Sequence, residues 1–206
     1  MRSLLIALFS ISVASCSTVA KEPVSFSGVA YYSMPWAVKI DALPTQVNVQ
    51  QLQQELQASL DKANKVLSTY QNDTELMQFN QSSVGQWQQL SPMLFNTIQT
   101  SLTVSNATQG VYDVTVGALV ELWGFGKQAV PSHIPSQAEI DTVRQRVGWQ
   151  SILLNPQTRQ AQRQKNVFLN LSSLGEGGGV DELEKILAKY QIHSYMLSVA
   201  GTLKTQ

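Results

Sequence analysis

The chain has 206 residues, a formal net charge of zero and only 14% charged residues. A length of this order is enough for one domain with a substantial core. The sequence holds no basic run for a nucleic acid and no acidic tail, so nucleic-acid binding is disfavoured. Its many glutamines lie inside periodic segments, which indicates a globular composition.

The N-terminal sequence MRSLLIALFSISVASCS combines a lone Arg2, a short apolar run and then small residues. This pattern is typical of a secretory signal and is too short for a spanning helix. The stretch ending in Cys16 resembles a bacterial lipobox. Cys16 is the only cysteine in the sequence, which excludes a disulfide framework. We expect a signal peptide at 1–15 and a lipidated linker at 16–24, anchoring the protein to a bacterial membrane in the periplasm. The alternative is an unmodified cysteine within a simple signal peptide.

The first half of the mature chain carries clear element signals. Residues 25–40 are rich in aromatic and β-branched residues, which predicts a strand pair or one long strand. Apolar residues recur at spacings of three and four over 49–70, which predicts an amphipathic helix. Ser91 and Pro92 are typical of the N-cap and first position of a helix, here expected to reach Thr108 before Gly110.

The second half alternates predicted helices and strands. Ser136 begins a third helix, because Glu139 three residues later completes a capping box. Short strands are expected at 151–154 and 167–171, a fourth helix at 180–190 and a last strand at 194–199. The interleaving favours α+β or α/β, and we predict an α+β fold with a mixed sheet and flanking helices.

A glycine cluster stands at FLNLSSLGEGGGVDELEK, residues 168–185. Glycines before a helix allow close approach of a ligand to unpaired amides, so phosphate is one candidate occupant. A structural tight turn is the alternative, since neither a P-loop nor the usual dinucleotide pattern is present. The carboxylate of Glu176 would repel phosphate unless it serves a hydroxyl, an amine or a metal.

Two further stretches carry candidate site residues, LSTYQNDTELMQFN at 67–80 and GVYDVTVGALVELWGFGK at 110–127. Tyr70 is either a stacking surface or an ordinary tyrosine at a helix end. Asp113, set among apolar residues, either caps the chain or binds a ligand. The aromatic residues of LWGFG either wall a pocket or fill a core corner. Only two histidines occur, far apart and without metal-ligand spacing, so a zinc site is disfavoured.

Together these segments resemble the FAD:protein FMN transferases. The matching stretches are LSTYQNDTELMQFN, GVYDVTVGALVELWGFG, IPSQAEID with VGWQSILL, LNLSSLGEGGGVDELEKIL and QIHSYMLSVAG. The resemblance implies a Mg²⁺-dependent phosphoryl transfer that attaches FMN from FAD to a threonine hydroxyl. The acceptor is implied to be a protein of a membrane redox complex.

The resemblance also implies roles for individual residues, although it identifies no catalytic residue. Mg²⁺ is expected to take the backbone carbonyl of Ser173. Contacts to FAD are expected from Tyr32, Tyr70, Val111, Tyr112, Asp113, Asn170 and Glu176.

Several positions depart from the family pattern. Tyr32-Ser33-Met34 stands where Met-Gly-Thr is usual, and Asn170 stands where an aspartate is usual. Gly178 replaces an aromatic residue, and Ala200-Gly201 replaces a double glycine.

In the family, a C-terminal region after the last strand supplies a histidine and the metal-ligating aspartates and threonine, whereas this sequence ends at Gln206. We therefore expect residues 25–206 to form an incomplete flavin transferase domain with little transfer activity of its own. The alternatives are a catalytically degenerate FAD-binding lipoprotein and a gene fragment without function.

Overall fold

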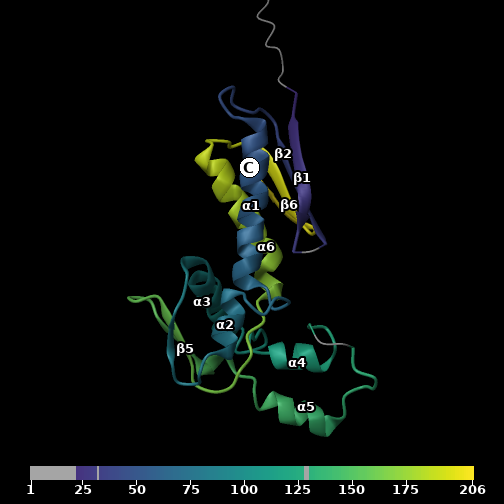
Figure 1. The fold of residues 1–206 in the computed structure, drawn as a ribbon, viewed down its shortest axis with the longest axis vertical. Coiled ribbons are helices and arrows are strands. Elements are labelled where there is room, and N and C mark those ends of the chain that lie inside the picture. Colours follow the sequence, from purple (N-terminus) through teal and green to yellow (C-terminus); the bar gives the residue numbers. More distant parts are fainter. Residues whose placement is uncertain (1–21, 32, 128–129) are drawn as a thin grey trace, which may run out of the picture.

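The computed structural model describes residues 22–31, 33–127 and 130–206. The predicted signal peptide, the lipidation site Cys16 and the expected flavin contact Tyr32 lie outside these residues. The described chain forms helices and two sheets (Figure 1). Each sheet is associated with its own hydrophobic core. No helix in this described part is both long and apolar enough to cross a bilayer.

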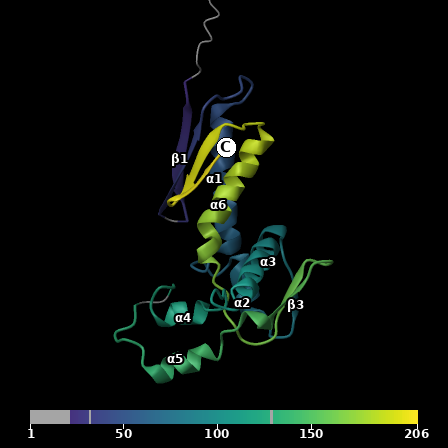
Figure 2. The ribbon, with the colours of Figure 1, turned by 180° about the vertical axis from the view of Figure 1, so that it is seen from behind.

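The first sheet joins the two ends of the described chain in the order β1-β2-β6-β7, with every pair antiparallel. Its strands are β1 (Val24–Ala30), β2 (Met34–Ile40), β6 (Tyr195–Val199) and β7 (Thr202–Thr205). Helices α1 (Val49–Leu67) and α6 (Ser172–Lys189) lie side by side against one face of this sheet (Figure 1 and Figure 2). The core between them includes the fully buried Trp36, Leu56 and Leu183.

The second sheet is smaller and has the antiparallel order β3-β5-β4. Its strands are β3 (Trp87–Gln89), β4 (Ile152–Asn155) and β5 (Gln160–Arg163). It shares a second core with α2 (Glu75–Gln81) and α3 (Pro92–Ala107), built around Phe79, Ile98 and Leu169. The remaining helices are α4 (Gly117–Leu122), α5 (Gln137–Arg144) and a 3-10 turn at Trp149–Ser151.

The two helix starts predicted from capping residues are confirmed, because each capping side chain makes its expected bond. The Ser91 hydroxyl accepts from the Leu94 amide at 3.3 Å, and Pro92 is the first residue of α3. Ser136 and Glu139 form the complete capping box at the start of α5. Helix α1 ends at Leu67, three residues before the expected end.

The α+β class is confirmed, whereas the expected mixed sheet is instead two antiparallel sheets. Residues 167–171 do not form the expected strand, apart from an isolated parallel bridge between Val116 and Phe168. The backbone groups of Leu169 bond to a side chain instead: Asn80 accepts from the Leu169 amide at 2.8 Å and donates to the Leu169 carbonyl at 2.9 Å. A side-chain amide thereby occupies the place of a neighbouring strand.

The glycine cluster is not a turn before a helix at Val180, because α6 already begins at Ser172 and contains it. The buried residues Val180, Leu183 and Leu187 pack into the core of the first sheet. This burial outweighs the low helix propensity of glycine, about 1 kcal/mol per residue relative to alanine.

The hairpin between β6 and β7 has a two-residue turn, Ala200-Gly201, with φ of 50° and 105°. Positive φ costs an alanine about 1–2 kcal/mol but costs glycine almost nothing. We therefore expect Ala200→Gly to raise the free energy of unfolding by about 1 kcal/mol, measured by urea denaturation. The exposed Ala188→Gly in α6 is the control, for which the same exchange lowers stability. Changes in the free energy of unfolding with the same sign in the two variants would contradict the expected relief of strain at Ala200.

Candidate functional site

The approach to α6 is fixed by Asn170. Its backbone amide donates to the Val114 carbonyl at 2.8 Å, which ties the segment to residues 111–116. Its side-chain oxygen accepts from the Ser172 amide at 2.9 Å and so closes a turn at the helix start. An asparagine oxygen can fill this local acceptor role as an aspartate can, so the departure at this position leaves the turn intact.

A cleft of about 430 Å³ opens beside the start of α6. Its size falls within the range of small-molecule sites. Segments distant in the sequence meet around it, and six of the predicted site residues line it: Tyr70, Val111, Tyr112, Asp113, Asn170 and Ser173. The structure therefore brings together the residues that sequence motifs had singled out separately.

The walls of the cleft are aromatic and unusually exposed. Phe125 is 76% exposed, Val111 92% and Tyr70 50%. The Tyr70 hydroxyl donates to the Phe125 carbonyl at 3.3 Å, and the Tyr112 hydroxyl lies 3.0 Å from the Ser173 hydroxyl. Phe125 of the LWGFG stretch thus belongs to a pocket wall and not to a core corner. Exposed apolar groups gathered at a concavity are typical of a binding site.

Asp113 has a structural role within this cleft. Its Oδ1 atom accepts from the Thr115 amide at 2.8 Å and from the Thr115 hydroxyl at 2.6 Å. Its Oδ2 atom accepts from the Trp149 amide at 3.1 Å. Both carboxylate oxygens therefore bind the protein itself, and Asp113 shapes the wall of the cleft by fixing two loops.

A second hollow, of about 90 Å³, shares Tyr70 and Ser172 with the cleft. It contains Glu176, the remaining predicted site residue among those described, together with Met34 and Tyr31. The Tyr31 hydroxyl lies 3.4 Å from the Gly175 carbonyl, and burial, with a smaller effect of Glu182, raises the pKa of Tyr31 to about 12. Tyr31 therefore remains a protonated donor at neutral pH. No motif had marked this residue.

The glycines of α6 have two different surroundings. An alanine methyl at Gly175, Gly177 or Gly178 would meet no atom within 4 Å. A methyl at Gly179 would lie 3.0 Å from the Tyr31 hydroxyl and 3.3 Å from two core side chains. Gly179 therefore permits close packing between α6 and the sheet. Gly177 and Gly178 instead line a groove of about 340 Å³ between α1, α3 and α6, which Ser173 also borders.

These surroundings predict opposite responses at neighbouring glycines. We expect Gly178→Ala to raise the free energy of unfolding by about 0.5–1 kcal/mol, because it gains helix propensity in open space. Gly179→Ala should be at least about 1 kcal/mol less stable than Gly178→Ala, since its methyl crowds the packed interface. Urea denaturation of both variants measures the difference. Equal stabilities would show that the interface at Gly179 relaxes freely.

The described residues contain no cluster of metal-ligating side chains. Within residues 22–31, 33–127 and 130–206, no group of three or more His, Cys, Asp and Glu side chains could hold a metal ion. Mg²⁺ requires about six oxygen ligands, and the Ser173 carbonyl provides one at most. His133 is exposed, 3.4 Å from Glu139, and belongs to neither hollow.

Comparison with known proteins identifies the family of this chain. The ApbE family model matches residues 32–206. The FAD:protein FMN transferase of Escherichia coli K12 is 35% identical over 175 residues, which cover 83% of this chain and 49% of the relative. The flavin transferase ApbE from Vibrio cholerae superposes with a TM-score of 0.85 at 28% identity, covering 90% of this chain and 59% of that one. ApbE from Pseudomonas stutzeri, in its apo form, gives 0.83 at 25% identity over 90% and 61%. The chain spans about half the length of the curated relatives it matches, and it belongs to the ApbE family.

Proposed function

We propose that this chain binds FAD across the two adjoining hollows and contributes to the transfer of FMN from FAD to a protein acceptor. The observation that carries the proposal is the convergence of the family-matched positions. Six of them line the cleft, and Glu176 lies in the hollow that shares Tyr70 and Ser172 with it. The names of the relatives support flavin transfer as the activity of the family.

The side chains suit the parts of a dinucleotide. The exposed faces of Tyr70 and Phe125 offer stacking surfaces for an aromatic ring system. The Tyr112 and Ser173 hydroxyls, 3.0 Å apart, can donate to phosphate oxygens. Glu176 accepts hydrogen bonds and suits a hydroxyl or N–H of the ligand better than a phosphate. These residues bind and orient FAD, and no catalytic base is assigned among them.

In the proposed reaction, a threonine hydroxyl of the acceptor attacks the FMN-side phosphorus of the pyrophosphate. The bond between the two phosphates breaks, AMP leaves, and the hydroxyl proton is lost to solvent or a base. Mg²⁺ belongs to the proposal as the group that neutralises phosphate charge. The family resemblance supplies the Ser173 carbonyl, and no group of three or more His, Cys, Asp and Glu side chains in the described residues could add to it, so further ligands would come from FAD, water or polypeptide outside them.

We also propose that the protein is exported and lipid-anchored through Cys16, and that its acceptor belongs to a membrane redox complex. The support is the signal-like N-terminal sequence with its lipobox resemblance. Expression in a bacterium with Cys16→Ser tests the anchor. The parent should sediment with membranes and the variant should appear in the soluble periplasmic fraction. Sedimentation of both would overturn the lipid anchor.

Titration of FAD, followed by flavin fluorescence, tests the binding proposal. We expect saturable binding and a Kd raised about tenfold by Tyr70→Ala, a loss equivalent to about 1.4 kcal/mol. Trp87→Ala is the matched control, because Trp87 is 41% exposed on β3 and lines neither hollow. Absence of binding by the parent chain would overturn the proposal.

Transfer is tested separately with FAD, Mg²⁺ and a threonine-bearing peptide, by searching the peptide for an FMN mass adduct. An adduct supports transfer by this chain. Binding without an adduct would instead identify the chain as an FAD-binding protein that does not transfer FMN by itself.

A further inference from the structure

Glu176 does not lie free in its hollow. The Thr202 hydroxyl donates to its Oε2 atom at 2.8 Å, from a position 26 residues away in the sequence. Both side chains are partly buried. A hydrogen bond to an ionised carboxylate is stronger than one between neutral groups, and it restricts rotation of the acceptor side chain. No residue in the described part of the chain donates to the Oε1 atom, which leaves that oxygen for a ligand.

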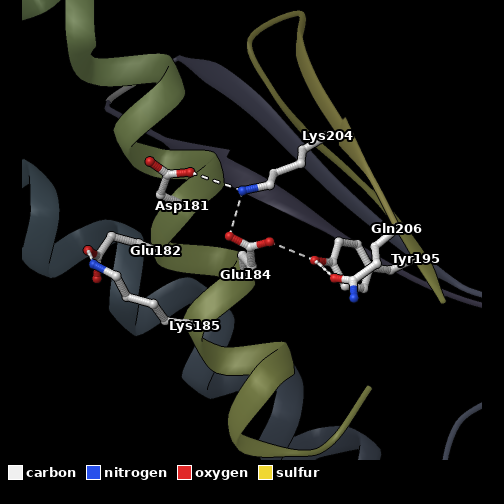
Figure 3. Close-up of polar contacts among 7 residues, drawn as sticks. All are labelled: Asp181, Glu182, Glu184, Lys185, Tyr195, Lys204 and Gln206. Carbon is white, nitrogen blue, oxygen red and sulfur yellow. Dashed lines mark hydrogen bonds and ion pairs between the residues drawn. The ribbon is translucent and has the colours of Figure 1, made fainter. Parts of the chain in front are cut away.

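Thr202 is itself held firmly, because β7 is fastened to α6 along one side. Thr202 and Lys204 alternate along β7 and share a face, and Gln206 directly follows the strand. Figure 3 shows the Lys204 amine between Asp181 and Glu184 of α6, at 3.5 and 2.6 Å. The Tyr195 hydroxyl lies 2.8 Å from both Glu184 Oε1 and Gln206 Oε1.

Charge reinforces this attachment. The hydrogen bond from Lys204 lowers the pKa of Glu184, with a smaller contribution from Tyr195, and the same contact raises the pKa of Lys204. Both groups are therefore ionised at neutral pH. The two-residue turn at Ala200-Gly201 places Thr202 directly opposite Val199 of β6 and so fixes the backbone position from which the hydroxyl reaches Glu176.

From this arrangement we infer that Thr202 is a positioning residue for flavin binding, which holds one oxygen of Glu176 so that the other accepts a hydroxyl or N–H of the ligand. The inference rests on the proposed function, and it assigns to the β6–β7 hairpin a role in the site that no sequence motif indicated. The cost of ordering the Glu176 side chain is then met on folding and not on binding.

The test compares Thr202→Val, which removes the hydroxyl at nearly constant volume, with Thr202→Ser, which retains it. FAD titration should give a Kd raised about 5- to 10-fold by valine and less than about 2-fold by serine. Thr205→Val is the control, because Thr205 is exposed on the other face of β7. Thermal unfolding without FAD is recorded for each variant, to separate positioning from general loss of stability.

A double-mutant cycle with Glu176→Ala, which removes the accepting carboxylate, provides a readout that a purely structural role would not move. We expect Thr202→Val to change the Kd by less than about 2-fold in the Glu176→Ala background. Equal effects of valine in both backgrounds, or a parent-like Kd for Thr202→Val, would overturn the positioning role alone. A parent chain that does not bind FAD would overturn the proposed function and remove the basis of this inference.

Discussion

We expect Asn80→Ala to lower the free energy of unfolding by about 3 kcal/mol, because two buried backbone groups lose their partner at once. Asn80 bonds to the amide and to the carbonyl of Leu169, at 2.8 and 2.9 Å, and it is only 6% exposed. Leu169 is fully buried, so water cannot replace the lost side chain without opening the second core. Urea denaturation measures the change.

The exposed Gln81→Ala on the same helix is the control, with an expected effect below about 0.5 kcal/mol. Asn80→Asp refines the test, since a carboxylate accepts from the Leu169 amide but cannot donate to its carbonyl. It should be as destabilising as alanine or more so, because it buries a charge. An Asn80→Ala variant as stable as the parent would show that residues 167–171 are held without Asn80, by their apolar side chains and their backbone bonds to Val114 and Gly117.

Features set by neighbouring residues could be predicted from the sequence. The caps at Ser91 and Ser136 depend on bonds that span three residues, so their signals are complete within a short stretch. Helix α1 likewise follows from the spacing of its apolar residues, since Leu52, Leu56 and Leu60 are all fully buried. In both cases, the residues that form the sequence pattern are the ones that make the stabilising contacts.

Features set by distant partners could not be predicted in this way. Residues 167–171 have an apolar alternation that suits a strand, but the backbone of Leu169 at their centre bonds to the side chain of Asn80, about ninety positions away. The glycines of α6 predict a turn, whereas the structure makes this stretch helical, with Val180 and Leu183 of the same helix packed against the first sheet. The strand at Gln160–Arg163 is short and polar, and its pairing with β3 and β4 decides its conformation.

The candidate site, like the fold, could be predicted only in part. Motifs identified residues that do meet at one place, including Tyr70, Tyr112 and Ser173. They did not separate residues that face a ligand from residues that hold the walls of the cleft. The side-chain oxygens of Asp113 and Asn170, for example, accept hydrogen bonds from backbone amides of the protein itself. Tyr31 and Thr202 belong to no motif, and only the fold brings them beside α6.

We expect Asp113→Ala to lower the free energy of unfolding by about 3 kcal/mol and to weaken FAD binding at least about tenfold. The carboxylate accepts from the Thr115 amide, the Thr115 hydroxyl and the Trp149 amide, and all three bonds are lost together. The buried Thr115 hydroxyl also accepts from the Gly148 amide at 2.7 Å, so the loss spreads to the loop before Trp149. The cleft wall then no longer keeps its shape.

Thr115→Val separates this structural role from a direct contact between Asp113 and FAD, because it breaks the same network without removing the carboxylate. If Asp113 acts by holding the loops, Thr115→Val should weaken FAD binding in proportion to its loss of stability, as Asp113→Ala does. The exposed Asp73→Ala is the control for loss of a negative charge. A Thr115→Val variant with reduced stability but parent-like FAD affinity, beside an Asp113→Ala variant that does not bind, would show that the carboxylate contacts the ligand itself. Denaturation and fluorescence titration of the same preparations distinguish the two outcomes, because the first measures stability and the second measures FAD affinity.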